Sequence, residues 1–399
     1  MNQMTTAEIA ARTPTVSKAG RYDVTVFIGR FQPYHLGHHK IVTEALERSD
    51  TVVILVGSVF EPRNPRNPFT YEERRDMIML SVPPEQRSRI RIRPILDWTY
   101  MGNRWLVETK RVVNEVVRDL NLDRKARVAL IGHSKDASSY YLNMFKPDWE
   151  SINVGNYENL DSTFFRNIYF SNAGEMKLRS TLRHEGERET PRELMLPDAV
   201  HQFLEQFITT DAYKALREET EWNLNYRAPF TELQFPPVFQ TVDAAIVHRG
   251  KILLVKRRAL PGKGLWALPG GYLVPGRTLL DSILIEIKEE TNLKVPPSVL
   301  LGSLVWNREF DDPYRSARGR VITQGYAFQL SNDMEQPKVR GKKLESDDEG
   351  DPDGGTEYAQ WFDLSDVTRD MMFEDHWYIT QVLTANMENK TTPTNLRRN

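Results

Sequence analysis

Two histidines three residues apart, His35 and His38, have the type and spacing of a phosphate-binding pair. They lie in GRFQPYHLGH, residues 29–38, between an apolar run and a segment with the apolar spacing of a helix. This spacing puts both imidazoles on one face of the first helical turn, where unpaired N–H groups and partial positive charge attract anions. Gly29 lets the backbone approach a ligand, and Gly37 leaves room at the start of the helix. The pattern predicts a polyphosphate site.

The alternative is a pair of histidines beside a turn that binds nothing. We favour the phosphate site because a strand precedes the pair, a helix follows it, and a glycine stands at each end. Two common phosphate-binding motifs, GxxxxGK[ST] and GxGxxG, do not occur in the sequence.

A second group consists of three glutamates in the amphipathic segment LLDSILIEIKEETNL: Glu286, Glu289 and Glu290. Their spacing of i, i+3 and i+4 places them on one side of a helix. The core-facing stripe of the same helix is predicted to be Leu280, Ile283, Leu284 and Ile287. Clustered carboxylates repel one another unless a cation joins them, and oxygen ligands suit Mg²⁺ or Mn²⁺. A solvent-exposed acidic helix face is the alternative.

The elements that must position these groups follow from the apolar pattern. Apolar runs at 25–29, 51–59 and 128–133 alternate with helical segments, one of them from Trp105 to about Leu120. This alternation predicts a doubly wound α/β domain with a parallel sheet, whose ligands bind at the carboxyl ends of the strands. The histidine pair follows the first such strand.

The second half of the chain has a different pattern. Two strand-like runs flank a turn at Arg249-Gly250, a Gly/Pro-rich loop leads into the glutamate helix, and the runs LLGSLVW, ITQGYAFQL and YAQWFDL follow. This order favours an α+β domain. The charged run 338–355 is typical of a solvated loop.

We therefore expect five segments along the chain. They are a flexible N-terminal segment (1–20), the α/β domain (21–210), a docked linker (211–238), the α+β domain (239–387) and a disordered tail (388–399).

Composition excludes several classes of protein. The 399 residues include 40% hydrophobic residues, enough for packed cores, and no cysteine, which excludes disulfides, thiolate nucleophiles, zinc fingers and iron–sulfur clusters. The net charge of −2, with only short basic clusters, argues against nucleic-acid binding. No stretch approaches the roughly 20 apolar residues of a membrane span, and the N-terminus lacks a secretory apolar core. We expect a cytoplasmic protein that binds no membrane, and a homo-oligomer is compatible with the sequence.

GRFQPYHLGH resembles the signature of the HxGH nucleotidyltransferase superfamily, and more narrowly that of the archaeal-type nicotinamide mononucleotide (NMN) adenylyltransferases. The stretches NPFTYEERRDMI (67–78), DWTYMGNRWL (97–106) and GHSKDASSYYLNMF (132–145) also resemble that family. The resemblance implies a Rossmann-like enzyme that forms NAD and pyrophosphate from NMN and ATP, with Mg²⁺ bridging ATP oxygens. A second family signature resembles LRSTLR (178–183), in which Ser180 replaces a threonine and Arg183 is retained.

The same resemblance implies roles for individual residues. His35 and His38 hold the triphosphate and stabilise charge on the leaving pyrophosphate, and Arg183 does the same from the second signature. Trp105 stacks on the nicotinamide ring or, alternatively, is an ordinary core tryptophan. The other implied nucleotide contacts are Gly29, Arg30, Phe31, Gln32, Gly37, Asn67, Gly132, His133, Lys135, Asp136 and Ser180.

The loop LWALPGGYLVPG and the helix after it resemble the Nudix hydrolase motif, G-x5-E-x7-R-E-U-x-E-E-x-G-U with U aliphatic, starting at Gly271. Three positions depart from it: Arg277 replaces the first Glu, Ile285 replaces the Arg, and Asn292 replaces the second Gly. Residues 310–328 resemble ADP-ribose-preferring Nudix domains. The fusion as a whole resembles the bifunctional NMN adenylyltransferase/Nudix proteins.

Three functions remain open at this point. In the first, Glu286, Glu289 and Glu290 hold Mg²⁺ or Mn²⁺, which activates water to split ADP-ribose into AMP and ribose 5-phosphate, with Glu286 counted among the catalytic residues. In the second, the Nudix domain only binds or senses ADP-ribose or NAD, because the replaced Arg no longer braces the glutamates. In both of these functions, Arg277 is predicted to contact phosphate. The third, a nucleic-acid regulator, is disfavoured by the charge pattern.

Overall fold

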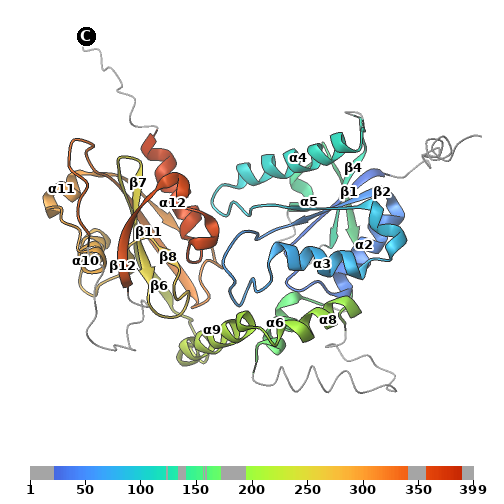
Figure 1. The fold of residues 1–399 in the computed structure, drawn as a ribbon, viewed down its shortest axis with the longest axis horizontal. Coiled ribbons are helices and arrows are strands. Elements are labelled where there is room, and N and C mark those ends of the chain that lie inside the picture. Colours follow the sequence, from blue (N-terminus) through green and yellow to red (C-terminus); the bar gives the residue numbers. More distant parts are fainter. Residues whose placement is uncertain are drawn as a thin grey trace, which may run out of the picture.

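The computed structural model of the chain describes residues 22–122, 125–133, 141–155, 157, 160–171, 195–339 and 356–388. These residues form two sheets that lie side by side, each covered by helices (Figure 1). Helices α8 (Asp198–Phe207) and α9 (Asp211–Arg227) run from the N-terminal part toward the C-terminal part. No described helix combines the length and the apolar character needed to cross a membrane.

The N-terminal sheet has five parallel strands among the described residues, in the order β3-β2-β1-β4-β5. The strands are β1 (Tyr22–Gly29), β2 (Ser49–Val56), β3 (Ile90–Pro94), β4 (Val128–His133) and β5 (Glu150–Val154). The helices are α2 (Leu36–Arg48), α3 (Tyr71–Ser81), α4 (Gly102–Asp119), α5 (Tyr141–Met144) and α6 (Ser162–Tyr169), with a 3-10 turn at Pro84–Arg89. The predicted doubly wound α/β domain is confirmed. The apolar pattern does not predict β3 and β5, because both are short and carry charged or polar residues.

Strand β2 is buried on both faces, as its continuous apolar run predicts. Val52, Ile54 and Val56 pack in the core that includes α2 and α3, whereas Val53 and Leu55 pack in the core that includes α4. Helices therefore cover both faces of the sheet. The chain builds β2 on one side of β1 and β4 on the other, so the β1–α2 loop lies at the switch point where open α/β sheets bind ligands.

The segment predicted to be a linker, 211–238, contains helix α9 over more than half its length. Thr210 caps the helix by accepting a hydrogen bond from the backbone N–H of Tyr213. The sequence shows no strong period here because only a few positions are buried against a neighbour. Both ends are docked: Tyr213 packs 5.0 Å from the Tyr169 ring, and the hydroxyls of Tyr226 and Tyr272 lie 2.7 Å apart.

The C-terminal sheet has seven described strands; five form the path β10-β11-β6-β7-β12, and β8 and β9 pair with β7 and β6. The strands are β6 (Val238–His248), β7 (Lys251–Arg257), β8 (Trp266–Ala267), β9 (Gly270–Tyr272), β10 (Leu304–Phe310), β11 (Arg320–Gln329) and β12 (Thr356–Asp363). The helices are α10 (Leu279–Thr291), α11 (Pro297–Gly302) and α12 (His376–Glu388). Among the described strands, β11 and β6 are the only pair that runs in parallel, so the mixed sheet with helices confirms the predicted α+β domain.

Local details of this domain agree with the sequence except at one run. The β6–β7 hairpin turns at Arg249 (φ 48°) and Gly250 (φ 76°), as predicted. The run LLGSLVW is not a single strand, because its first residues belong to α11. Pro297 occupies the first position of this helix. Proline is tolerated there because a backbone N–H at that position would have no partner within the helix. Three predicted segments fall wholly or partly outside the described residues: the N-terminal segment 1–20, residues 340–355 of the charged run and the tail beyond Glu388.

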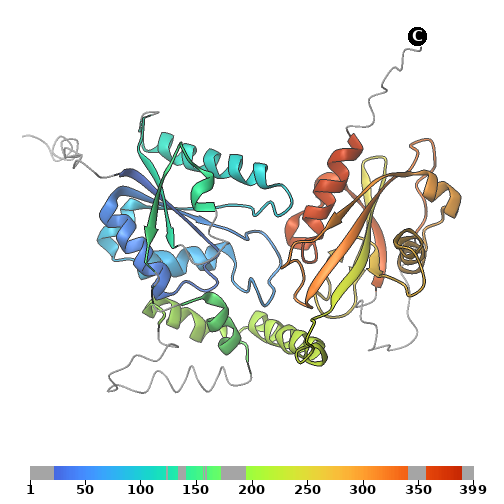
Figure 2. The ribbon, with the colours of Figure 1, turned by 180° about the vertical axis from the view of Figure 1, so that it is seen from behind.

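The two domains contact each other where the loop 95–101, between β3 and α4, lies against α12 (Figures 1 and 2). The Trp98 ring lies 5.8 Å from Trp377 and 6.3 Å from Tyr378, and the Tyr100 ring lies 4.9 Å from Phe310. An aromatic seam therefore joins the two parts of the chain.

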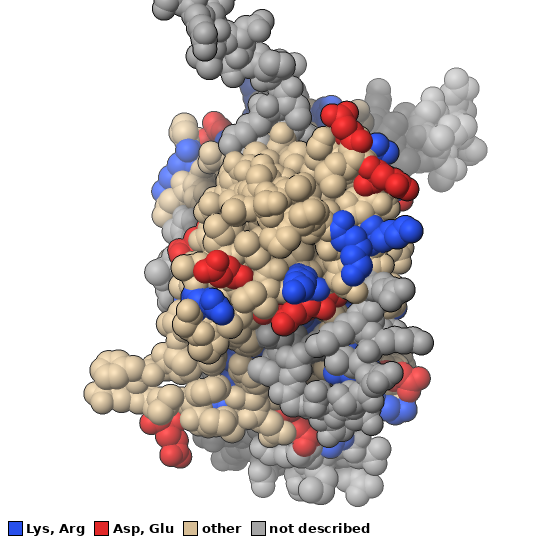
Figure 3. All heavy atoms as spheres, turned by 90° about the vertical axis from the view of Figure 1, so that its left-hand side faces the viewer, with Lys and Arg blue, Asp and Glu red and all other residues tan. Residues whose placement is uncertain are grey.

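The outer face of the C-terminal domain carries interspersed Lys, Arg, Asp and Glu side chains among uncharged residues (Figure 3). On the described surface in this view, charges of one sign do not gather into the continuous basic patch that nucleic-acid binding requires.

Candidate active sites

The histidine pair lies at the start of α2, after β1, where the sequence places it. His35 is the N-cap of α2, and the two rings stack with centroids 3.7 Å apart. The backbone N–H of His38 donates to Nδ1 of His35 (3.4 Å), and that of His35 donates to Nδ1 of His38 (3.3 Å). A ring nitrogen that accepts a hydrogen bond carries no proton, so each neutral ring has its proton on Nε2. The pair thus carries two N–H donors of the kind that bind phosphate oxygens.

The charge state of His38 follows from its surroundings. Burial lowers the pKa of His38 well below its ordinary value, and the neighbouring His35 lowers it further. At neutral pH His38 is therefore an uncharged hydrogen-bond donor.

The two glycines of the motif are needed for ring packing. A Cβ on Gly37 would lie 3.0 Å from Nδ1 of His35, so this glycine lets the His35 ring fold back over the helix start. A Cβ on Gly29 would lie 2.8 Å from the Phe31 ring, so the space beside Gly29 holds Phe31 and not a ligand, contrary to the reason given from sequence. The Phe31 ring is buried and packs edge-on against His38, with centroids 4.9 Å apart.

Hydrogen bonds from buried polar side chains fix the conformation of the loop of residues 29–38. Gln32 exchanges two hydrogen bonds with the backbone of Phe69, at 3.0 and 2.9 Å. Its side chain is buried and helps to shape the loop, and its contact with a nucleotide stays a prediction. Arg74 donates to the carbonyl oxygens of Arg30, Gly57 and Ser58.

Positive charge accumulates around this loop. Arg166, which donates to the Gln32 carbonyl at 2.7 Å, has a pKa lowered to about 9 by burial and by Arg30 and Arg66. Burial and Arg30 also lower the pKa of Arg66. Within the described residues, nothing accepts a hydrogen bond from the buried Nη1 of Arg30. Buried cations that repel one another, with an unpartnered N–H among them, favour an anionic ligand.

The sequence missed Arg66, Arg74 and Arg166 as members of this group. Arg66 is next to Asn67, which the resemblance implied as a nucleotide contact. An arginine in a polar loop does not by itself indicate a binding site. Asn67 donates to Glu61 at 3.4 Å, and its buried Oδ1 receives no hydrogen bond in the described part of the chain.

The other predicted contacts of this site fall into three classes. Gly132 and His133 end β4 at the same sheet edge, where His133 Nδ1 bonds to the Val154 carbonyl oxygen at 3.2 Å. Trp105 is half-buried and packs edge-on against Phe145, which favours the core-tryptophan alternative. The residues outside the described ranges are Lys135, Asp136, Ser180 and Arg183.

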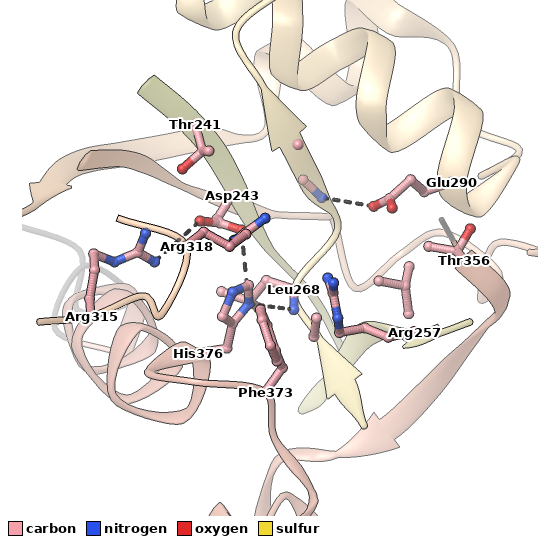
Figure 4. Close-up of a pocket in the computed structure, with 14 residues that line it drawn as sticks. Thr241, Asp243, Arg257, Leu268, Glu290, Arg315, Arg318, Thr356, Phe373 and His376 are labelled. Atoms are coloured by element: carbon pink, nitrogen blue, oxygen red, sulfur yellow. Dashed lines mark hydrogen bonds and ion pairs between the residues drawn. The ribbon is translucent and has the colours of Figure 1, made fainter. Parts of the chain in front are cut away.

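A pocket opens in the C-terminal sheet (Figure 4). Its polar lining includes Thr241, Asp243, Arg257, Glu290, Arg315, Arg318, Thr356 and His376. Asp243 accepts a hydrogen bond from Thr323 (2.6 Å) and lies 4.0 Å from Arg315. Nδ1 of His376 accepts the backbone N–H of Leu268 at 3.1 Å, and burial lowers the pKa of His376.

The arginines of this pocket come from two segments. Arg315 and Arg318 belong to the stretch 310–328, whose resemblance to ADP-ribose-preferring domains was the available signal. Arg257 ends β7 and appeared in the sequence only as part of a short basic cluster. Three guanidinium groups in one pocket suit a ligand with a pyrophosphate group.

The three predicted glutamates of helix α10 lie in different environments. Ile283 and Ile287 are buried and Leu280 and Leu284 half-buried, which confirms the core stripe. Glu290 lines the pocket and accepts the N–H of Gly270 at 2.8 Å, Glu286 is half-buried, and Glu289 is exposed. Among the described residues, no three His, Asp or Glu side chains are grouped as metal ligands, so the metal set stays a prediction.

The three departures from the Nudix motif have different consequences. Asn292 adopts the left-handed conformation (φ 46°) at the C-cap of α10, which asparagine tolerates almost as well as the expected glycine. Arg277 is exposed and does not line the pocket, so the structure gives no support for a phosphate contact there. Ile285 is half-buried on α10 and supplies no donor to the neighbouring carboxylates.

Comparison with known proteins agrees with the division of the chain into two domains. The Cytidylyltransferase-like family model matches residues 26–153, and the NUDIX domain model matches residues 237–383. The fold and the two sites thus define a nucleotidyltransferase fused to a Nudix domain.

Individual relatives narrow this class. A nicotinamide/nicotinic acid mononucleotide adenylyltransferase from Acinetobacter baylyi is 34% identical over 200 residues, 50% of this chain and 94% of that protein. A bifunctional NMN adenylyltransferase/ADP ribose pyrophosphatase from Francisella tularensis, crystallised with AMP and an Mn ion, matches 92% of this chain and 99% of its own, with a TM-score of 0.75 and 31% identity. An ADP-ribose pyrophosphatase from Methanocaldococcus jannaschii is 35% identical over 32% of this chain and 63% of that protein. The chain belongs to the family of bifunctional NMN adenylyltransferase/ADP-ribose pyrophosphatases, as the sequence predicts.

Proposed function

We propose that the N-terminal domain transfers the adenylyl group of ATP to NMN, forming NAD and pyrophosphate. Two observations carry this proposal: the stacked pair His35 and His38, and Arg30 of the same loop, whose buried Nη1 has no partner among the described residues. Family membership supplies the substrates. ATP, NMN and NAD are the proposed ligands, and a cytoplasmic location remains a prediction from the sequence.

The chemistry needs little from the protein beyond positioning and charge. An oxygen of the NMN phosphate attacks the α-phosphorus of ATP, and the bond from that phosphorus to the β-phosphate bridging oxygen breaks, so pyrophosphate leaves with the electron pair. His35 and His38 donate their Nε2–H groups to phosphate oxygens, and Arg30 and Arg66 neutralise charge. Arg183 is proposed to hold the leaving group from the second signature. A divalent cation, Mg²⁺ in this proposal, supplies further charge neutralisation when bound with the nucleotide.

For the C-terminal domain we propose hydrolysis of ADP-ribose to AMP and ribose 5-phosphate. The arginines of the pocket neutralise the pyrophosphate, and Glu290 is directed into the same pocket. In this proposal Glu286, Glu289 and Glu290 would hold a divalent cation through carboxylate oxygens of the type that Mg²⁺ and Mn²⁺ bind. Of the three, Glu290 is the one that lines the described pocket. When bound, the cation supplies activation of water.

The second candidate function of this domain is binding of ADP-ribose or NAD without hydrolysis. The observation that favours it is Ile285, which cannot brace the glutamates as the motif arginine does. The intact protein is incubated with ATP plus NMN and, separately, with ADP-ribose plus Mn²⁺ or Mg²⁺, and products are separated by chromatography. NAD in the first reaction supports adenylyl transfer. AMP in the second supports hydrolysis, whereas ADP-ribose binding without AMP leaves only the sensor.

A further inference from the structure

An arginine of the C-terminal domain reaches into the N-terminal domain. Arg369, in the 3-10 turn Arg369–Met371, is buried, and its Nη1 donates to the carbonyl oxygen of Val59 at 2.7 Å. Its Nη2 lies 3.2 Å from the carboxylate of Glu61 and 3.8 Å from that of Asp97. One guanidinium thus holds three groups of the other domain.

The groups that Arg369 contacts belong to the nucleotide site or support it. Glu61 accepts the side-chain N–H of Asn67 at 3.4 Å. Asp97 accepts the backbone N–H (2.9 Å) and the hydroxyl (2.6 Å) of Ser58. The loop 58–67 follows β2 at the same sheet edge as the histidine pair, and it carries Arg66.

The far end of the same loop also touches the C-terminal domain. Nη1 of Arg66 donates to the carbonyl oxygen of Tyr314 at 2.7 Å, and its guanidinium lies 4.8 Å from the Tyr314 ring centroid. Both ends of the loop are therefore held from outside its own domain.

Charge gives the contact a second effect. Burial raises the pKa of Glu61, Asp97 raises it further, and Arg369 opposes both. Arg74 and Arg66 are the next cations near Glu61. In the absence of Arg369, Arg74 and Arg66 would be the cations left to pair with an ionised Glu61, and a Glu61–Arg66 pair would compete with phosphate for Arg66.

We propose that Arg369 is a positioning residue for adenylyl transfer: the Nudix domain holds the loop 58–67 and keeps the charge of Glu61 away from Arg66. This inference rests on the proposed function of the N-terminal domain.

The test measures KM and kcat for NMN and ATP in the full chain. For R369M we expect KM for at least one substrate to rise about tenfold, with kcat changed less than about threefold, because ground-state binding is weakened. In R369M/E61Q, KM should return to within about threefold of E61Q alone, because the competing charge is gone. K251M, which removes a cation paired with Asp363 at 2.8 Å, is the matched control and should change neither constant.

A folded R369M with wild-type KM values, or a double variant as impaired as R369M, would overturn the proposal. If R369M does not fold, R369K decides by amide hydrogen exchange: exchange over 58–67 should rise about tenfold relative to 41–48, and unchanged exchange would contradict the role of Arg369. Wild-type NAD formation is measured first. Its absence would reject adenylyl transfer itself, whereas a normal wild type with an unaffected R369M rejects only the inference.

Discussion

Tyr100 of the N-terminal domain donates its hydroxyl hydrogen bond to Asp375, 275 residues further along the chain. Asp375 in turn accepts two hydrogen bonds from Arg315, both at 2.9 Å, and Arg315 lines the pocket of the C-terminal domain. Burial alone would raise the pKa of Asp375, but Arg315 holds it below its ordinary value, so the carboxylate is charged. A side chain outside the Nudix domain therefore helps to orient an arginine within it.

Replacing Tyr100 with phenylalanine should weaken ADP-ribose binding. Loss of one buried hydrogen bond is worth about 1 kcal/mol, which corresponds to a three- to tenfold rise in Kd. Titration calorimetry with ADP-ribose and Mn²⁺ measures it. Y22F removes a hydroxyl bonded to Glu150 at 2.6 Å, at the far side of the N-terminal sheet, and should leave Kd unchanged. An equal effect of both variants would contradict the coupling.

Replacing His38 with alanine should lower NAD formation by about 100-fold or more, the usual effect of removing a donor to developing charge. Circular dichroism should show a folded protein, with a loss of about 1 kcal/mol in unfolding free energy, because the ring also caps α2. Turnover near that of the wild type would refute the proposed role.

Gly37→Ala tests the packing of the histidine pair. The added Cβ would press on the His35 ring at 3.0 Å, displace the cap and reduce NAD formation about tenfold or more. Gly102→Ala is the matched control, since a Cβ on Gly102 at the start of α4 meets nothing within 4 Å. Steady-state rates and thermal melting compare the two. A G37A enzyme as active as G102A would show that ring placement is unimportant.

Glu219 predicts a pH dependence of stability. Burial raises its pKa to about 7, helped by Glu374 and opposed by the N–H of Gly262 and by Arg257. The unfolded carboxyl ionises near 4.5, so folding is favoured fully below that pH and the advantage is lost as pH rises through 7. At pH 8, E219Q should therefore increase the unfolding free energy by about 1–3 kcal/mol, which raises the melting temperature. At pH 4.5 the substitution should change both quantities little. E218Q, at an exposed position of the same helix, should show no such difference.

Glu290 lines the pocket, whereas Glu289 faces solvent on the same helix, so the two glutamates can be compared. E290Q should reduce Mn²⁺-dependent AMP formation from ADP-ribose about 100-fold, because the carboxylate in the pocket is lost. E289Q changes an exposed side chain and should cost less. Product chromatography at matched Mn²⁺ concentrations decides, and a larger loss in E289Q would contradict this ranking. If the wild type forms no AMP, ADP-ribose affinity replaces rate as the readout.

Local patterns determined much of the architecture. The apolar runs of β1, β2 and β4 and the stripe of α10 follow from burial, which acts on each residue separately. The same holds for the histidine pair, because three residues along one helical turn suffice to bring the rings together. Strands β3 and β5 escaped prediction because their few residues are held by pairing with neighbours rather than by their own apolar character.

The sequence by itself determined the two domains, the histidine pair at a helix start and the glutamates on one helix. Only the tertiary structure decided that Arg66, Arg74 and Arg166 surround one loop, that Glu290 but not Glu289 lines the pocket, and that Arg369 and Tyr100 cross between domains. The reason is that these contacts join residues tens to hundreds of positions apart, where no local spacing carries information. Long-range packing alone sets which distant charges are buried together and which face water.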